Sequence, residues 1–152
     1  MNPIDPSSEP PAFDFELMRL VLESSPYYKH LNMELLEAGD GFARVAMNLE
    51  THHNNTQGIV HGGALCSLAD QTGLAAIGTQ LKLGQRPRTV QMDVRYLAPG
   101  RGRRLIAEGR VMKMGGLVSF SDVDIKDETG RTVVAARCTC AIVHFEGDEK
   151  FK

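Results

Sequence analysis

The pattern of hydrophobic and polar positions divides the chain into a short helical segment, a long apolar segment and six strand-like segments. In the first segment, apolar residues recur at helical spacing and the pattern stops before Pro26. The residues that carry this spacing are Phe13, Leu17, Leu20 and Val21. We therefore expect a short amphipathic helix at the start of the domain.

The strand-like segments alternate apolar and polar residues with a period of two. Residues 31–39 and 42–50 flank the turn Gly39-Asp40-Gly41, which predicts a β-hairpin. Four longer segments follow, separated by Pro99-Gly100, Gly115-Gly116 and Glu128-Thr129-Gly130, which are typical turn sequences. These longer segments are residues 88–98, 104–114, 117–127 and 132–145.

Residues 62–81 form the most hydrophobic segment, which is too long for one strand and rich in Ala and Leu. These properties favour a helix. Because the segment is apolar nearly all round, such a helix needs cover on most sides, and the rest of the chain supplies mainly strands. We therefore predict an α+β protein in which a curved antiparallel sheet wraps around one long central helix.

The length of 152 residues fits a single domain. We expect a mobile, proline-rich tail over residues 1–11, one domain over residues 12–146, and a charged tail over residues 147–152. The N-terminal residues lack the basic start and apolar run of a signal peptide.

Composition narrows the classes of function. Charged residues make up 24% of the chain and the formal net charge is −2, so we expect neither nucleic acid nor a membrane as a partner. No apolar stretch predicts a membrane span, because the segment 62–81 contains Ser67, Asp70, Gln71 and Thr72. The three cysteines, Cys66, Cys138 and Cys140, form neither an even set nor a CxxC pair. A reduced, cytoplasmic protein is the best fit.

Asp70 is the only formally charged residue between Gly58 and Gln80. Burying a carboxylate without a partner costs several kcal/mol. Asp70 is therefore either hydrogen-bonded to a neighbouring hydroxyl such as that of Ser67, or kept for chemistry. The sequence leaves both interpretations open.

Gly62 and Gly63 lie where the loop enters the predicted helix. A helix N-terminus presents unpaired N–H groups that can polarise a carbonyl, although two glycines also suit a tight turn. Asp70 lies seven residues after Gly63, which is roughly 10 Å along a helix. The two can act on one group only if two such helices pack antiparallel across a twofold axis.

The segment before the helix is rich in polar side chains: His52, His53, Asn54, Asn55 and His61. The spacing does not suit a metal site, because no second ligand lies at helical spacing, and we expect neither a metal nor a cofactor. Asn side chains in such a loop commonly bind their own backbone, whereas an Asn amide beside a glycine N–H would form an oxyanion hole. No G-x-S-x-G motif or phosphate-binding glycine loop is present.

The stretch NTQGIVHGGALCSLAD, residues 55–70, resembles the signature of hotdog-fold acyl-CoA thioesterases of the phenylacetic-acid-degradation (PaaI-like) type. An Asn lies six residues before the His of HGG, and an Asp lies nine residues after it. The strand from Val90 to Pro99 and the turn from Lys113 to Gly116 extend the resemblance over roughly residues 15–145.

This resemblance implies a hotdog fold that assembles as dimers or dimers of dimers and hydrolyses an acyl-CoA to free CoA and a carboxylic acid. Asn55 and the Gly63 N–H would hold the thioester carbonyl, and Asp70 of the neighbouring chain would be the general base or nucleophile. Thr89, where some relatives carry Ser, would orient the water. His61 would mainly order the loop.

The resemblance also implies that the CoA phosphates lie at the protein surface. The basic side chains available there are those of Arg101, Arg103, Arg104 and Lys113, which could equally be a solvated rim. Further substrate contacts are expected at Gly62, Tyr96, Gly115 and Gly116.

Domains that resemble this one also serve two other functions. A non-catalytic acyl-CoA-binding or regulatory module is the main alternative, and Asp70 argues against it. A dehydratase would need a His in the central helix region, and none lies between Gly62 and Leu83. The acyl group itself could be aromatic, short-chain or medium-chain.

Overall fold

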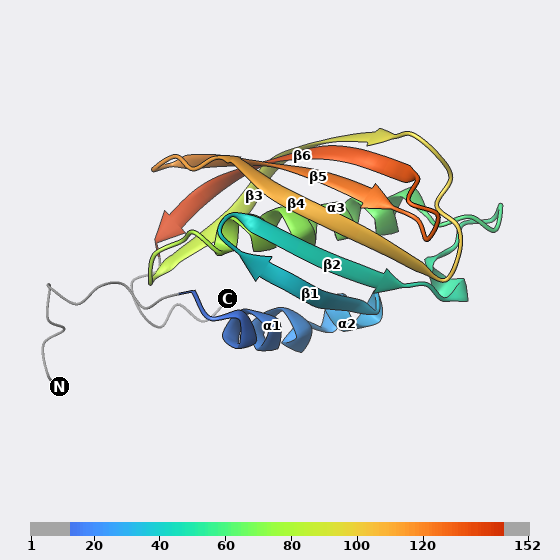
Figure 1. Cartoon of the computed structure of the whole chain (residues 1–152), viewed down its shortest axis with the longest axis horizontal. Helices are drawn as coiled ribbons and strands as arrows, with labels where there is room; N and C mark the ends of the chain where they lie inside the picture. The colour runs from blue at the N-terminus through green and yellow to red at the C-terminus, as the bar shows by residue number, and fades with distance from the viewer. Residues whose placement is uncertain (1–12, 145–152) are drawn as a thin grey trace, which may run out of the picture.

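A computed structural model of the chain describes residues 13–144 and shows a curved antiparallel sheet wrapped around one long helix, with two short helices beneath (Figure 1). The described residues form one sheet with the long helix packed in its curve. The predicted tails at residues 1–11 and 147–152 lie outside the described residues.

The sheet contains six antiparallel strands in the order β1-β2-β4-β5-β6-β3. The expected hairpin is β1–β2, which turns at Asp40 and Gly41, both of which have positive φ. The four longer predicted strands are also confirmed. The strands are β1 (Met33–Gly39), β2 (Phe42–Asn48), β3 (Gln85–Tyr96), β4 (Arg104–Lys113), β5 (Val118–Lys126) and β6 (Thr132–His144).

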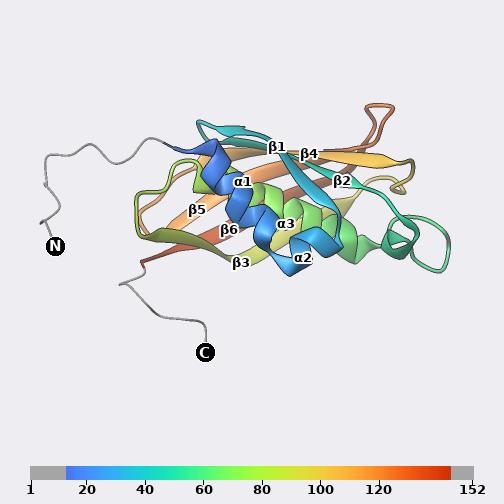
Figure 2. The same cartoon turned by 90° about the horizontal axis from the view of Figure 1, so that it is seen from below.

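The two short helices, α1 (Phe15–Ser24) and α2 (Pro26–His30), follow each other beneath β1 and α3 (Figure 2). The Asp14 side chain caps α1 by accepting a hydrogen bond of 3.0 Å from the backbone N–H of Leu17. Pro26 begins α2. A Pro suits the first position of a helix because it lacks the N–H that would stay unpaired there. The predicted opening helix is therefore confirmed.

The core-facing side of α1 is not the stripe that the sequence singled out. Phe15, Met18 and Leu22 pack against the core. The predicted stripe faces outward, and Leu17 is 60% exposed. The helix carries apolar residues on two faces, so its spacing alone could not identify the face that packs.

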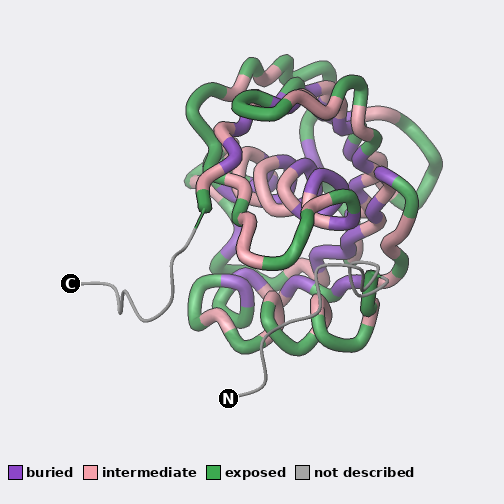
Figure 3. Tube along the Cα trace, turned by 90° about the vertical axis from the view of Figure 1, so that its left-hand side faces the viewer, coloured by how far each residue is buried: buried purple, intermediate pink, exposed green. Residues whose placement is uncertain are grey.

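The central helix α3 (Gly62–Gly78) ends three residues before the apolar segment does. Two glycines let the sheet approach it closely. A Cβ at Gly109 of β4 would lie 2.9 Å from the carbonyl oxygen of Thr72, and one at Gly73 would lie 2.7 Å from Cys138 Sγ. In end view, α3 lies inside the curve of the sheet (Figure 3).

Strand β3 is an edge of the sheet and pairs only with β6. Pro87 lies within it, which an edge strand tolerates because one side of its backbone needs no ladder partner. The pairing shifts between Thr89 and Gln91, so that Val90 is an extra residue and is 61% exposed. This bulge re-aims the side chains around it.

Candidate active site

The Asp70 carboxylate has a partner in the structure. Thr89 of β3 donates a hydrogen bond of 2.6 Å from Oγ1 to Asp70 Oδ1. Asp70 is half-buried on α3, and Thr89 is exposed beside it. The alternative partner, Ser67, instead donates to the carbonyl oxygen of Gly63 at 2.9 Å. Asp70 is therefore hydrogen-bonded to a hydroxyl, as one of the two interpretations proposed, but the hydroxyl is that of Thr89 and not that of Ser67.

Two buried thiols of β6 form the wall behind Asp70. Cys138 Sγ lies 3.8 Å from the carbonyl oxygen of Ala69, and Cys140 Sγ lies 4.0 Å from Thr89 Oγ1. Burial, and next the negative charge of Asp70, raise the pKa of the Cys138 thiol to about 12. Burial also raises the pKa of Cys140. This wall is therefore uncharged at neutral pH, so Asp70 faces no competing anion there.

His61 caps the N-terminus of α3. Its Nδ1 accepts a hydrogen bond of 2.8 Å from the Gly63 N–H. The N–H of Gly62 donates to no other residue within 13–144. A Cβ at Gly63 would lie 3.0 Å from His61 Nδ1, so the glycine gives the ring room. The helix end thus presents two backbone donors, of which one is occupied by the protein's own side chain.

Tyr96, at the end of β3, lies against the same helix end. Its hydroxyl donates to the Gly62 carbonyl oxygen at 3.1 Å and lies 2.8 Å from Cys66 Sγ. A Cβ at Gly62 would lie 3.3 Å from this hydroxyl. The contact with Cys66, followed by burial, raises the pKa of Tyr96 to about 12. Tyr96 is therefore a neutral group that contacts the first turn of α3.

Asn55 orders the loop that precedes α3. Its Oδ1 accepts a hydrogen bond of 2.9 Å from the Gln57 N–H, and its own N–H donates to Ile59 at 2.8 Å. The expectation that an Asn binds the loop backbone is therefore confirmed. The Nδ2 amide of Asn55 donates to no other described residue. It is the part of Asn55 available to a ligand.

The single chain does not bring all the predicted catalytic groups together. Asp70 follows Gly63 by seven residues on the same helix, which corresponds to roughly 10 Å along the axis. Asn55 and His61 belong to the loop at the Gly63 end, whereas Thr89 lies at the Asp70 end. One chain therefore holds two half-sites.

The predicted basic rim is also divided between two ends of the molecule. Arg101 and Arg103 lie in the loop between β3 and β4, beside the start of α3, where Val60 N–H donates to the Gly100 carbonyl at 3.0 Å. Lys113 ends β4, nine residues after Arg104, or roughly 30 Å away. The turn with Gly115 and Gly116 lies there too (Figure 1). Arg104 itself pairs with Glu34 at 2.9 Å.

Two residues near the site were not identified as such from the sequence. The Tyr27 hydroxyl of α2 lies 2.7 Å from Ser67 Oγ on the open face of α3. Tyr27 and Ser67 are forty positions apart in the sequence, so no local sequence pattern predicts their contact. His53 is buried at the base of the loop that precedes α3, and from the sequence it was a candidate only for a metal ligand.

Within residues 13–144, no group of three or more His, Cys, Asp or Glu side chains could hold a metal ion. In the same range, no helix has the length and apolar character needed to cross a membrane.

Comparison with known proteins gives consistent results. Residues 57–134 match the model of the family described as Thioesterase superfamily. The chain is 30% identical over 129 residues to the medium/long-chain acyl-CoA thioesterase YigI of Salmonella typhimurium, covering 75% of this chain and 83% of that protein.

Solved structures also resemble the chain. The PaaI protein of the phenylacetic acid degradation operon of E. coli superposes with a TM-score of 0.76 at 26% identity, covering 82% of this chain and 88% of the other. A thioesterase of Haemophilus influenzae gives a TM-score of 0.83 at 20% identity, covering 91% and 96%. The latter supports the hotdog fold alone.

Proposed function

Since the chain belongs to the thioesterase superfamily and is a thioester hydrolase, we propose that its substrates are acyl-CoA thioesters and that Asp70 is the general base or nucleophile. The observation that carries the proposal is the Asp70 carboxylate held by Thr89 on the open face of α3. The named activity of the relative YigI supports the substrate class.

Hydrolysis of a thioester places negative charge on the carbonyl oxygen in the transition state. A preorganised donor at that oxygen contributes on the order of 3 kcal/mol. The Gly63 N–H and the Asn55 amide are the donors in this proposal. Because His61 Nδ1 occupies the Gly63 N–H in the free chain, the substrate carbonyl replaces the imidazole when it binds.

Asp70 then activates the attack. Thr89 occupies Oδ1, which leaves Oδ2 to take a proton from water while the water oxygen bonds to the carbonyl carbon. The C–S bond breaks, and the CoA thiolate leaves and is protonated. In the nucleophilic alternative, a carboxylate oxygen of Asp70 bonds to the carbonyl carbon first, the C–S bond breaks and the CoA thiolate leaves and is protonated. Water then cleaves the resulting anhydride, which releases the carboxylic acid and restores the Asp70 carboxylate.

The two half-sites imply a shared active site between two chains. Strand β3 offers a 12-residue edge with no partner on one side, and long open edges are normally covered in natural proteins. Pairing two copies antiparallel through this edge and the open face of α3 brings Asp70 of one chain towards Gly63 and Asn55 of the other. A dimer, or a dimer of dimers, then has two equivalent sites per pair.

The same pairing explains the divided rim. Because α3 begins at one end of the molecule and the turn after Lys113 lies at the other (Figure 1), antiparallel chains place that turn beside the neighbour's Arg101 and Arg103. Within residues 13–144, the side chains of Arg101, Arg103 and Lys113 form no ion pair. They are available for the phosphates of CoA.

The test begins with a panel of aromatic, short-chain and medium-chain acyl-CoAs and a thiol-detecting reagent. Release of free CoA supports the proposal and identifies the acyl group. Binding of acyl-CoA without release would instead support the non-catalytic module.

Mixing two inactive variants tests the shared site. An Asp70→Asn chain and an Asn55→Ala chain, each nearly inactive alone, restore one site in each mixed dimer. If reassortment is statistical, about half of the dimers are mixed, giving roughly a quarter of wild-type activity for independent sites. Subunit exchange shown by mass spectrometry without regained activity would contradict the model.

A further inference from the structure

His53 is a buried histidine whose ring is hydrogen-bonded on both sides. It is 1% exposed. Nδ1 accepts a hydrogen bond of 2.8 Å from the Glu50 N–H, and Nε2 lies 2.9 Å from the Leu31 carbonyl oxygen. Nδ1 also lies 3.2 Å from the Glu50 carbonyl oxygen. Because the Glu50 N–H can only donate and the Leu31 carbonyl can only accept, the shorter contact on each side makes Nδ1 the acceptor and Nε2 the donor. These contacts hold the ring of His53 in one orientation.

The two ring bonds join separate segments of the chain. Leu31 follows helix α2, and Glu50 precedes the short 3-10 helix η1 (Thr51–His53). The Nε2 bond connects η1 to Leu31 at the end of α2, whereas the Nδ1 bond connects the last residue of η1 to Glu50 at its start. The ring thus fixes the orientation of the peptide group that follows His53.

That peptide group closes the loop of residues 53–61, which we call the catalytic loop because the proposed function places Asn55 and His61 in it. The His53 carbonyl accepts a hydrogen bond of 2.8 Å from the His61 N–H, which closes the loop at its base. His61 in turn contacts the Gly63 N–H, and Asn55 lies within the closed loop. A change at His53 therefore displaces both of the donors that the proposed function assigns to the oxyanion.

We propose that His53 is a positioning residue of the thioesterase site, and that its Nδ1 acceptor sets the placement of the oxyanion donors. This inference rests on the proposed function of Gly63 and Asn55. His53 touches no substrate, and it acts through the backbone of residues 53–61.

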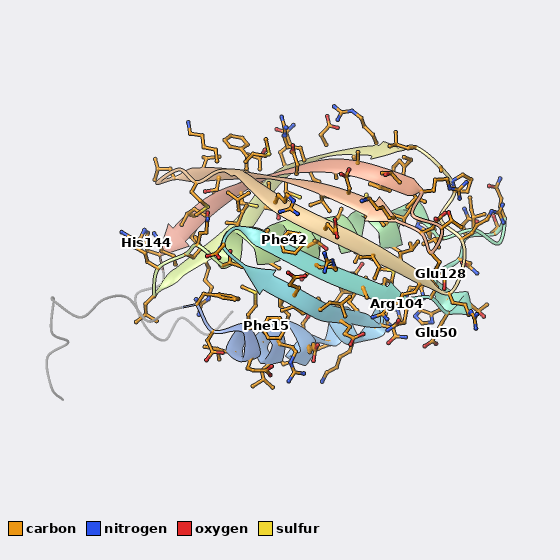
Figure 4. All side chains as sticks on the ribbon, viewed as in Figure 1. Phe15, Phe42, Glu50, Arg104, Glu128 and His144 are labelled. Atoms are coloured by element: carbon orange, nitrogen blue, oxygen red, sulfur yellow. The ribbon has the colours of Figure 1, made fainter. Side chains whose placement is uncertain are left out.

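The surroundings of His53 provide a matched control. The ring of His52 lies 4.1 Å from that of His53, centroid to centroid, but His52 is exposed. Its Nε2 lies 2.9 Å from the His30 carbonyl oxygen, and its Nδ1 lies 3.7 Å from a carboxylate oxygen of Glu50, whose backbone rather than side chain binds His53. Glu50, whose N–H binds His53, lies at the same end of the molecule as Arg104 and Glu128 (Figure 4). His52→Ala removes a neighbouring imidazole without touching the bonds of His53.

The experiment separates the two ring bonds with two amide variants. His53→Asn keeps an acceptor near the place of Nδ1 and loses the Nε2 donor. His53→Gln keeps a donor near the place of Nε2 and loses the Nδ1 acceptor. The measurements are kcat and KM on the best acyl-CoA, the thermal midpoint, and amide hydrogen exchange at His61 and Gly63.

We expect His53→Gln to lower kcat about tenfold with little change in KM, since small displacements of catalytic groups are costly. We expect His53→Asn to keep kcat within about threefold of wild type while its thermal midpoint falls. His52→Ala should match wild type. Equal kcat in the Gln variant and wild type, or an equal loss in His52→Ala, would overturn the proposal.

Amide exchange keeps this result separate from that of the proposed function. If the wild type hydrolyses no acyl-CoA, the proposed function fails, yet His53→Gln should still exchange faster than His53→Asn at the amides of His61 and Gly63. Equal exchange in both variants would show that His53 does not position the loop.

Discussion

The two sides of α3 differ in almost every physical respect. The side facing the sheet is fully buried at Leu68, Ala69 and Thr72, and the one hydroxyl there is satisfied by its own helix, at 2.7 Å from the Leu68 carbonyl. The open side carries Gly63, Ser67 and Asp70, which are half-buried or exposed. Burial on one side therefore stabilises the fold, while polar groups on the other are left for chemistry.

This division explains how a helix so apolar can hold a carboxylate. Asp70 lies at the border of the two sides, where Thr89 of the edge strand reaches it. Towards the sheet, the buried thiols offer it no charge. We expect changes on the sheet side to alter stability and changes on the open side to alter turnover.

The largest expected effect is that of Asp70→Asn on the open side. The amide keeps the shape and can accept the Thr89 hydrogen bond, but it cannot take a proton, so kcat should fall by about 10² or more. The free energy of unfolding should change little. Steady-state kinetics and urea unfolding measure the two, and Asp124→Asn, on the exposed part of β5, is the matched control. Retention of a tenth of the activity would make Asp70 structural.

Leu68→Ala should have the opposite profile. Leu68 is 0% exposed, and truncating a buried Leu typically lowers the free energy of unfolding by about 2–5 kcal/mol. Urea unfolding measures this loss. At a temperature where the variant remains folded, kcat should stay near that of wild type. A large fall in kcat without loss of stability would break the division between the two sides.

Thr89→Ala tests the link between Asp70 and the edge strand. We expect kcat to fall about tenfold, less than for Asp70→Asn, because water can replace one hydroxyl. Thr89→Ser keeps the donor and should restore most of the activity. An unchanged kcat in Thr89→Ala would remove Thr89 from the site.

The smallest perturbation is thiol labelling of the native protein. Cys66 is half-buried near the open end of α3, whereas Cys138 and Cys140 are buried on the sheet side. We expect a thiol-specific disulfide reagent to modify at most one thiol per chain, and Cys66→Ser to abolish labelling. Because burial raises the pKa of Cys138 and Cys140, raising the pH to about 9 should add no second thiol. Two or three fast-reacting thiols would show that the sheet side opens.

The position of the candidate site on α3 could be predicted from the sequence because its signals are local. The HGG stretch indicates where α3 begins, and the spacing of Asp70 from Gly63 indicates that one chain is insufficient. The catalytic and binding roles of the site residues remain predictions; these residues are Asp70, Thr89, Gly63, Asn55, His61, Tyr96 and those of the basic rim. The spacing of residues could not reveal that His61 occupies the Gly63 N–H, because that depends on the rotamer of one side chain.

The sequence by itself determined the six strands, the two-residue period that makes them a sheet, and the one helix apolar enough to need that sheet around it. Periodicity, caps and turn residues act over a few positions, so the chain displays them directly. The tertiary structure decided which face of α1 packs, that Thr89 rather than Ser67 holds Asp70, and that His53 is buried. Each of these depends on strand register, on the bulge at Val90 or on contacts between distant segments, and packing of the whole chain alone sets them.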